Sequence, residues 1–177
     1  MSVAIGELAP DFELVSTDGT WHSSADSVGP ATVVVFTCNH CPYALAWHDR
    51  IARAAQDYAN RGVRFLAINA NDADRYPRDS FEAMQQRVAD GDWPMPYLHD
   101  ASQDVARAYG AQTTPDVFVL DASGRLRYRG APDGDYEDPN AGAAWLRDAL
   151  DAIIAGAEPP RAQTPPLGCS IKWKPDA

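Results

Sequence analysis

Two cysteines separated by two residues carry the clearest chemical signal in this 177-residue chain. Cys38 and Cys41 directly follow a run of apolar residues, and a helical pattern begins at Pro42. The N-terminus of a helix offers unpaired N–H groups and about half a positive charge, which favour a thiolate over a thiol. We therefore expect Cys38 to have a lowered pKa and to act as a nucleophile.

The offset between the two cysteines suits an internal resolving reaction. Residues three apart lie on the same side of a helical turn, so Cys41 is expected to displace a partner held on Cys38 as a mixed disulfide. A protonated His40 would stabilise the reduced thiolate and raise the reduction potential. We expect the other polar neighbours of the pair, Asn39 and Thr37, to tune the same chemistry.

Metal binding is the main alternative use of the cysteine pair. A structural zinc site needs four ligands, and the chain lacks a second cysteine pair; the remaining donors are Cys169 and the scattered histidines His22, His48 and His99. An acidic stretch does not match the calcium-binding loop pattern and is expected to be solvated: Asp133, Asp135, Glu137 and Asp138. We therefore predict no metal, and thiol exchange needs no prosthetic cofactor.

The elements around the pair predict a parallel crossover. Residues 31–36 form a continuous β-branched and aromatic run, which is typical of a strand covered on both faces. Apolar residues then recur with helical spacing from residue 42 to 61, and residues 63–70 form a second buried strand. A cysteine pair beside such a strand–helix–strand unit is the pattern of a redox motif.

The rest of the pattern completes an α/β domain over residues 1–157. Asp79 and Glu82 are predicted to cap a helix that ends near Gly91. The later predicted elements are a short strand at 97–98, a helix at 102–110, a hairpin of strands 116–121 and 125–129, and a helix at 140–156. Together these elements predict a central mixed β-sheet flanked by helices.

Residues 158–177 differ in character from the domain and are predicted to form an extended arm. Four prolines rule out a helix there: Pro159, Pro160, Pro165 and Pro166. Extended chain from Gly156 to Cys169 spans roughly 40 Å, about one domain diameter. Cys169 could thus return to the pair as a resolving or relay thiol, or pack as a small apolar residue in a docked tail; the sequence leaves both open.

Charge and hydropathy limit the classes of partner. The formal net charge of −10 repels phosphate backbones and anionic lipid, so neither nucleic acid nor a membrane is an expected partner. No apolar run approaches the ~20 residues that span a bilayer. No lysine or arginine precedes Arg50, so the basic start of a secretory signal is missing, and we expect a cytoplasmic protein.

Four motifs resemble a known family when they are taken in order. They are residues 6–14 (GELAPDFEL), 36–42 (FTCNHCP) and 113–121 (TTPDVFVLD), and Gly124. The chain is similar over residues 6–156 to thioredoxin-fold redoxins of the AhpC/TSA family, which are peroxiredoxin-related and thioredoxin-like. The resemblance implies a thioredoxin-like fold with an N-terminal extension and the Pro-rich C-terminal arm. It also implies that Pro115 is a cis-proline facing Cys38 and that Thr114 offers its backbone to a substrate.

The resemblance implies a thiol:disulfide oxidoreductase. Its Cys38–Cys41 dithiol would exchange with disulfides or thiols of proteins or small molecules, supported by a thioredoxin- or glutathione-type reductant. One alternative is a peroxiredoxin-like antioxidant that reduces peroxide, although Val35 stands where a peroxiredoxin has threonine, three positions before its cysteine. An alternative of another class is a copper-binding chaperone, although similar chaperones have three residues between their cysteines.

Overall fold

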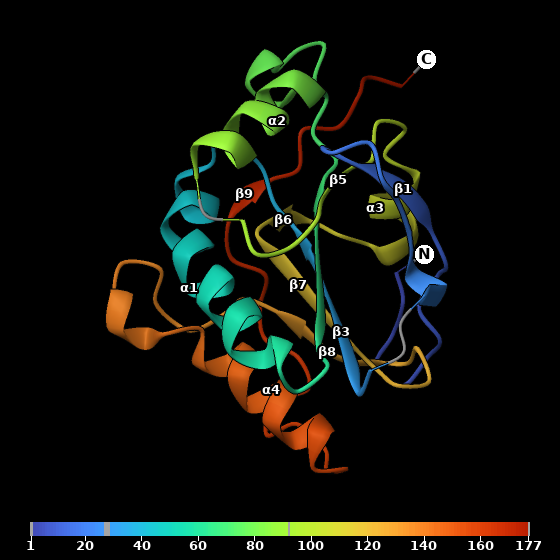
Figure 1. The fold of residues 1–177 in the computed structure, drawn as a ribbon, viewed down its shortest axis with the longest axis vertical. Coiled ribbons are helices and arrows are strands. Elements are labelled where there is room, and N and C mark those ends of the chain that lie inside the picture. The colour runs from blue at the N-terminus through green and yellow to red at the C-terminus, as the bar shows by residue number, and fades with distance from the viewer. Residues whose placement is uncertain (1, 27–28, 92, 177) are drawn as a thin grey trace.

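The computed structural model describes residues 2–26, 29–91 and 93–176. Within these ranges the strands are β1 (Glu13–Ser16), β2 (Trp21–Ser23), β3 (Ala31–Phe36), β4 (Arg64–Asn69), β5 (Tyr97–His99), β6 (Thr113–Thr114), β7 (Asp116–Asp121), β8 (Leu126–Gly130) and β9 (Cys169–Ser170). Seven of these strands form one sheet in the order β2-β1-β5-β4-β3-β7-β8, and β6 pairs with β9 beside it (Figure 1).

The helices are α1 (Pro42–Ala59), α2 (Phe81–Asp90), α3 (Asp104–Tyr109) and α4 (Ala144–Ile154). Short 3-10 turns lie at Ser24–Asp26, Pro77–Asp79 and Pro139–Ala141. The predicted fold class, a central mixed β-sheet flanked by helices, is confirmed. Among the described helices, none combines the length and the apolar character that a bilayer crossing requires.

The predicted crossover positions the cysteine pair. All six residues of β3 are buried, and β3 pairs parallel with β4 and antiparallel with β7. A strand covered on both faces needs apolar side chains at every position, which is why residues 31–36 show no alternation. Because β3 lies inside the sheet and leads directly to α1, the loop between them is held at the strand's carboxyl end.

Two apolar cores lie on opposite faces of the sheet. Val33 of β3 packs in one core with Trp47 of α1 and residues of α4, and these two helices lie together on one side in Figure 1. Val34 points to the other core, which α3 and the N-terminal segment cover. Adjacent residues of a strand point to opposite faces, so the single strand β3 fills both cores.

The N-terminal extension forms an antiparallel hairpin of β1 and β2, which the sequence pattern did not predict. β1 also pairs antiparallel with β5, where Val15 lies opposite His99. The extension therefore widens the sheet.

The C-terminal arm lies along the body. The amide of Arg129 donates to the Ala162 carbonyl (3.1 Å), and the amide of Thr164 donates to the Arg129 carbonyl (3.0 Å). Farther on, β9 pairs antiparallel with β6, and Ile171 is buried in the core that contains α3.

The prediction that the acidic stretch is solvated is wrong for Asp133, which is 1% exposed. Its carboxylate accepts hydrogen bonds from the Trp47 indole (2.9 Å) and the Ala143 amide (2.9 Å), and it pairs with the Arg50 guanidinium (2.9 Å). Arg50 is itself buried on α1 and needs a counter-charge. This buried ion pair ties α1 to the loop that precedes α4.

We predict that Asp133→Ala lowers the free energy of unfolding by about 3–5 kcal/mol, because it leaves the Arg50 charge buried without its partner. Chemical denaturation measures this change. Glu137→Gln, an exposed change in the same loop, is the control and should cost less than about 0.5 kcal/mol. Equal denaturation midpoints for Asp133→Ala and Glu137→Gln would contradict the prediction.

Candidate active site

The two thiols lie where β3 gives way to α1. Cys41 is the N-cap residue of α1, and Pro42 occupies its first turn, where a missing N–H costs nothing. Cys38 is 0% exposed and Cys41 is 1% exposed. The predicted placement of the pair at a helix N-terminus is confirmed, but both sulfurs are covered.

Thr114 contacts both sulfurs. Its hydroxyl lies 3.3 Å from the Cys38 sulfur, and the Cys41 thiol, when protonated, donates a hydrogen bond to its carbonyl oxygen (3.2 Å). The Thr114–Pro115 peptide bond is cis, as the family resemblance implied. The structure thus brings together four predicted site residues, Cys38, Cys41, Thr114 and Pro115.

The thiols also form a hydrogen bond with each other, so their ionisation belongs to the pair. This bond raises the pKa of Cys38, and burial and the charge of Asp79 raise it further. The same bond lowers the pKa of Cys41 to about 4 against the opposing effect of burial. Because the two thiols ionise as a pair, the lowered pKa expected of Cys38 stays a prediction. Cys41 is the N-cap of α1 and accepts a hydrogen bond from the Ala44 amide, whereas Cys38 lies near the Asp79 carboxylate.

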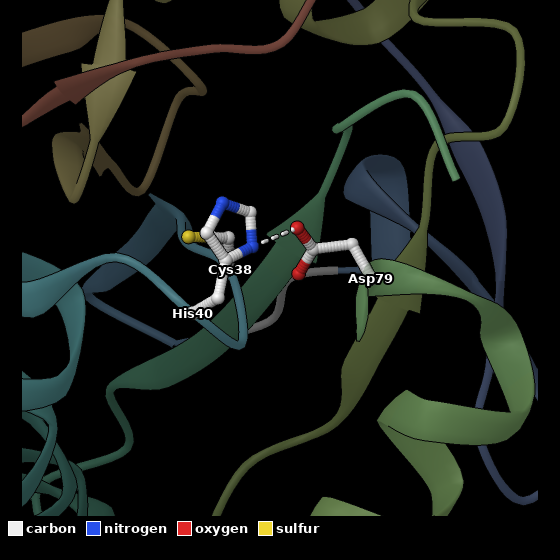
Figure 2. Close-up of side chains that lie close together, drawn as sticks. All are labelled: Cys38, His40 and Asp79. Atoms are coloured by element: carbon white, nitrogen blue, oxygen red, sulfur yellow. Dashed lines mark ion pairs between the residues drawn. The ribbon is translucent and has the colours of Figure 1, made fainter. Parts of the chain in front are cut away.

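His40 is held by Asp79, a residue that the sequence assigned a different role. The His40 Nδ1 lies 2.6 Å from the Asp79 carboxylate, which is fully buried, and Figure 2 shows the imidazole directed at it. The predicted cap of α2 by Asp79 and Glu82 is wrong, because Ser80 is the N-cap and its hydroxyl accepts from the Ala83 amide (3.2 Å). Asp79 ends the preceding 3-10 turn and points toward the cysteine loop.

Asp79 also anchors the backbone of that loop. Its carboxylate accepts hydrogen bonds from the Asn39 amide (2.7 Å) and from the side-chain amides of Asn69 (3.0 Å) and Asn71 (3.0 Å). Of these partners, the sequence pattern indicated Asn39 but neither Asn69 nor Asn71. The available signal was a polar segment directly after the buried strand β4, at the same sheet edge as the cysteines.

The other two tuning residues have well-defined contacts. The Asn39 side chain accepts from the Tyr97 hydroxyl (2.7 Å) and donates to the Arg78 carbonyl (2.8 Å), so it is fixed beside the pair. Thr37 is buried, and its amide donates to the Ile68 carbonyl (2.8 Å), which continues the β3–β4 ladder past the end of β3. Both residues hold the loop in register with the sheet.

Among the described residues, one group of side chains could hold a metal ion. Ligand atoms of Cys38, His40 and Asp79 lie within 4.8 Å of one another. The Asp79 oxygens, however, already accept three amide hydrogens and pair with His40, so an ion would have to displace these contacts. The arrangement suits the positioning of His40 better than the coordination of a metal.

Asp116 is a buried acid next to the cis-proline, and sequence analysis assigned it no role. It begins β7, is 0% exposed and accepts a hydrogen bond from the Gln112 amide (3.0 Å). Arg129 lies 3.9 Å away, and the second carboxylate oxygen has no hydrogen-bond partner among the described residues. Burial raises the pKa of Asp116 to about 6.

The chain also matches the sequence pattern of a known protein family. The pattern of the AhpC/TSA family matches residues 5–129. The chain belongs to this family. A solved structure of an uncharacterized conserved protein from Geobacillus kaustophilus is 42% identical to it, with a TM-score of 0.92, and the match covers 98% of this chain and 94% of that one.

Two further relatives of this AhpC/TSA family member carry functional names. The thiol-disulfide oxidoreductase ResA of Geobacillus thermodenitrificans (strain NG80-2) is 26% identical over 129 residues, which is 71% of this chain and 68% of the relative. The exposed lipoprotein thioredoxin Etrx1 of Streptococcus pneumoniae strain TIGR4 is 18% identical, with a TM-score of 0.61 over 76% of this chain and 98% of that one. The latter likeness concerns the fold alone, and the predicted thioredoxin-like fold is confirmed.

We predict that Asp116→Asn changes the pH dependence of stability. The pKa of Asp116 is about 6 in the folded protein against 3.8 for an ordinary carboxyl, so folding favours its protonated form. The wild type should therefore lose about 3 kcal/mol of stability through this group as the pH rises from about 4 to about 6. Asp116→Asn should not show this loss of stability, because its side chain does not titrate.

Denaturation of both proteins across this pH range measures the difference. Asp104→Asn, which removes a charge from an exposed position on α3, is the control and should follow the wild-type curve. Parallel curves for the wild type and Asp116→Asn would show that the buried carboxyl does not titrate in this range.

Proposed function

We propose that this protein is a thiol:disulfide oxidoreductase that uses the Cys38–Cys41 dithiol. The observation that carries the proposal is the contact of both sulfurs with Thr114 beside the cis-proline, because it places the reactive pair against a backbone segment that a partner chain can pair with. The name of the relative ResA supports the same reaction class.

The reaction is an exchange in two steps. The Cys38 thiolate attacks one sulfur of a partner disulfide, which forms a mixed disulfide and releases the other partner sulfur as a thiolate that takes up a proton. The Cys41 thiolate then attacks the Cys38 sulfur and releases the second partner thiolate, which is also protonated. Two electrons pass to the partner. With Cys41 ionised the pair holds one proton, which goes to one partner thiolate, and solvent supplies the proton for the other. The thiols' shared hydrogen bond lets Cys38 pass its proton to Cys41 before the first attack.

The surrounding groups prepare these steps. The Thr114 hydroxyl can donate to the Cys38 thiolate when it forms (3.3 Å). The half-buried His40 and the buried Asp79 form an ion pair beside the loop when the imidazole is protonated, so the positive charge that tunes Cys38 is balanced by a neighbouring negative charge. Because of this balance, His40 raises the reduction potential of the cysteine pair less than an unpaired histidine would.

The partners we propose are disulfides or thiols of proteins or small molecules, with a thioredoxin- or glutathione-type reductant. We also propose a cytoplasmic location, because three cysteines are too few for the disulfide scaffold of a secreted domain. The charge of −10 disfavours nucleic acid and anionic membrane as partners. Peroxide reduction and copper binding are the alternative outcomes that experiment has to separate.

We predict that Cys41→Ser accumulates a mixed disulfide on Cys38 when it is treated with glutathione disulfide, because the resolving sulfur is missing. Cys38→Ser should lower the rate of exchange at least about 100-fold, because the attacking sulfur is missing. Intact-mass spectrometry and a glutathione-release assay measure the two effects.

Parallel reactions of the reduced wild type with hydrogen peroxide and with Cu(I) test the alternatives. The rate of exchange with glutathione disulfide should exceed the rate of hydrogen peroxide consumption. A chelator of moderate affinity should remove Cu(I) from the protein. Faster peroxide consumption would favour the antioxidant function, and retention of copper with slow exchange would favour the chaperone.

A further inference from the structure

The third cysteine joins the other two in one sulfur cluster. Cys169 packs against the small buried cluster of Cys38, Cys41 and Ala44, although it lies more than a hundred residues from them along the chain. Cys38 and Cys41 are fully covered, whereas Cys169 is half-buried. Among the three sulfurs, Cys169 is therefore the one that solvent reaches in this conformation.

Strand pairing sets the position of Cys169. In the β6–β9 ladder, Cys169 lies directly opposite Thr114, the residue whose carbonyl accepts the hydrogen bond from Cys41. Gly168 permits this approach, because a Cβ atom there would lie 2.3 Å from the Thr114 carbonyl oxygen. The Ile171 amide continues the pairing by donating to the Gln112 carbonyl (3.1 Å).

The segment after Cys169 is clamped by side chains. The Lys172 amide donates to the Asn71 side chain (2.9 Å), and its carbonyl accepts from the Gln103 side-chain amide (2.9 Å). Gln103 also accepts from the Lys174 amide (2.9 Å). Gln103 is fully buried and has a left-handed backbone with φ of 69°, which a non-glycine residue adopts at a cost. A strained, buried residue thus holds the arm in place.

We propose that Cys169 is a third redox-active thiol that transfers the disulfide from Cys38–Cys41 to Cys41–Cys169. The Cys169 thiolate attacks the Cys41 sulfur, the Cys41–Cys169 bond forms, and the Cys38–Cys41 bond breaks to leave Cys38 as a thiolate. The step moves one disulfide and needs no external oxidant. A low-molecular-weight thiol then attacks the accessible Cys169 sulfur, which releases Cys41 as a thiolate and leaves a mixed disulfide on Cys169. A second thiol attacks this mixed disulfide, releases Cys169 as a thiolate and leaves as the low-molecular-weight disulfide, so the protein returns to its reduced state. This inference rests on the proposed function.

The contacts favour attack at Cys41 over attack at Cys38. The Cys169 thiol is hydrogen-bonded to Cys41, while the Cys38 sulfur faces the Thr114 hydroxyl. In the reduced protein, burial and the neighbouring Cys41 raise the pKa of Cys169 to about 11. Once Cys41 is part of a disulfide, its charge no longer opposes ionisation of Cys169, and Lys172 favours it. The order of the steps follows: Cys169 becomes reactive after the pair has been oxidised.

Two tryptic peptides report the bond directly. Because the chain has no lysine or arginine before Arg50, residues 1–50 form one peptide that contains both Cys38 and Cys41, and Cys169 lies in the peptide of residues 162–172. A Cys38–Cys41 bond closes a loop within the first peptide. A bond to Cys169 links the two peptides. Alkylation followed by mass spectrometry separates these forms after oxidation with glutathione disulfide.

The test uses Cys38→Ser with Cys41→Ser as the matched control, each leaving Cys169 and one partner thiol. Cys38→Ser should give the linked peptides at least about tenfold faster than Cys41→Ser, because Cys169 is held against Cys41 and the reaction is intramolecular. Equal rates in the two variants, or no linked peptide in Cys38→Ser, would overturn the transfer. Circular dichroism confirms that both variants are folded.

Cys169→Ser separates this inference from the proposed function. If the loop within residues 1–50 forms in this variant but re-reduction by glutathione slows at least about tenfold, both proposals are supported. If the loop forms and re-reduction keeps the wild-type rate, the transfer to Cys169 fails and the proposed function stands. If the loop forms in neither this variant nor the wild type, the proposed function itself fails.

Discussion

The buried carboxylate of Asp79 is the constraint on which the arrangement of the candidate site depends. A charge without solvent must be surrounded by donors, and Asp79 obtains them from the cysteine loop through Asn39 and from the end of β4 through Asn69 and Asn71. Asn71 in turn accepts from the Lys172 amide of the C-terminal arm. One carboxylate therefore connects three segments that are far apart in sequence, and the loop and the arm are positioned by the same set of hydrogen bonds.

The cis-proline segment contacts both the cysteine pair and the C-terminal arm. Thr114 contacts both sulfurs through its side chain and carbonyl, and its strand β6 is already paired with β9 of the arm. A partner chain that docks beside Thr114 by strand pairing has to compete with β9 for that edge. The arm thus occupies the place of a substrate, and a cysteine stands on it opposite Thr114.

Periodic patterns of apolar residues predicted the strands and helices whose formation depends mainly on neighbouring residues. The buried strand at residues 31–36 and the helix after it were predicted because a doubly covered strand and an amphipathic helix leave continuous signals. The cis bond before Pro115 was predicted from the family resemblance alone. Asp79 and Asp133 were misinterpreted because the burial of a carboxylate depends on donors and cations brought from distant segments, and no local pattern records them. The docking of the arm was left open for the same reason, since extended chain shows no periodicity that indicates where it pairs.

The burial of the sulfurs sets a condition on how electrons enter and leave. Thiol–disulfide exchange requires an attacking sulfur to approach its target along a free path, and Cys38 and Cys41 offer none while the arm is docked. Oxidation of the pair by a partner disulfide requires the arm to lift from β6, which breaks its bonds to Asn71 and Gln103. Reduction of the Cys41–Cys169 form begins at Cys169, which remains accessible while the arm is docked. Lifting of the arm suits a protein partner that replaces β9 by its own strand. Reduction at Cys169 suits a small thiol that needs no strand edge for docking. The docked arm thus discriminates between partners by their size.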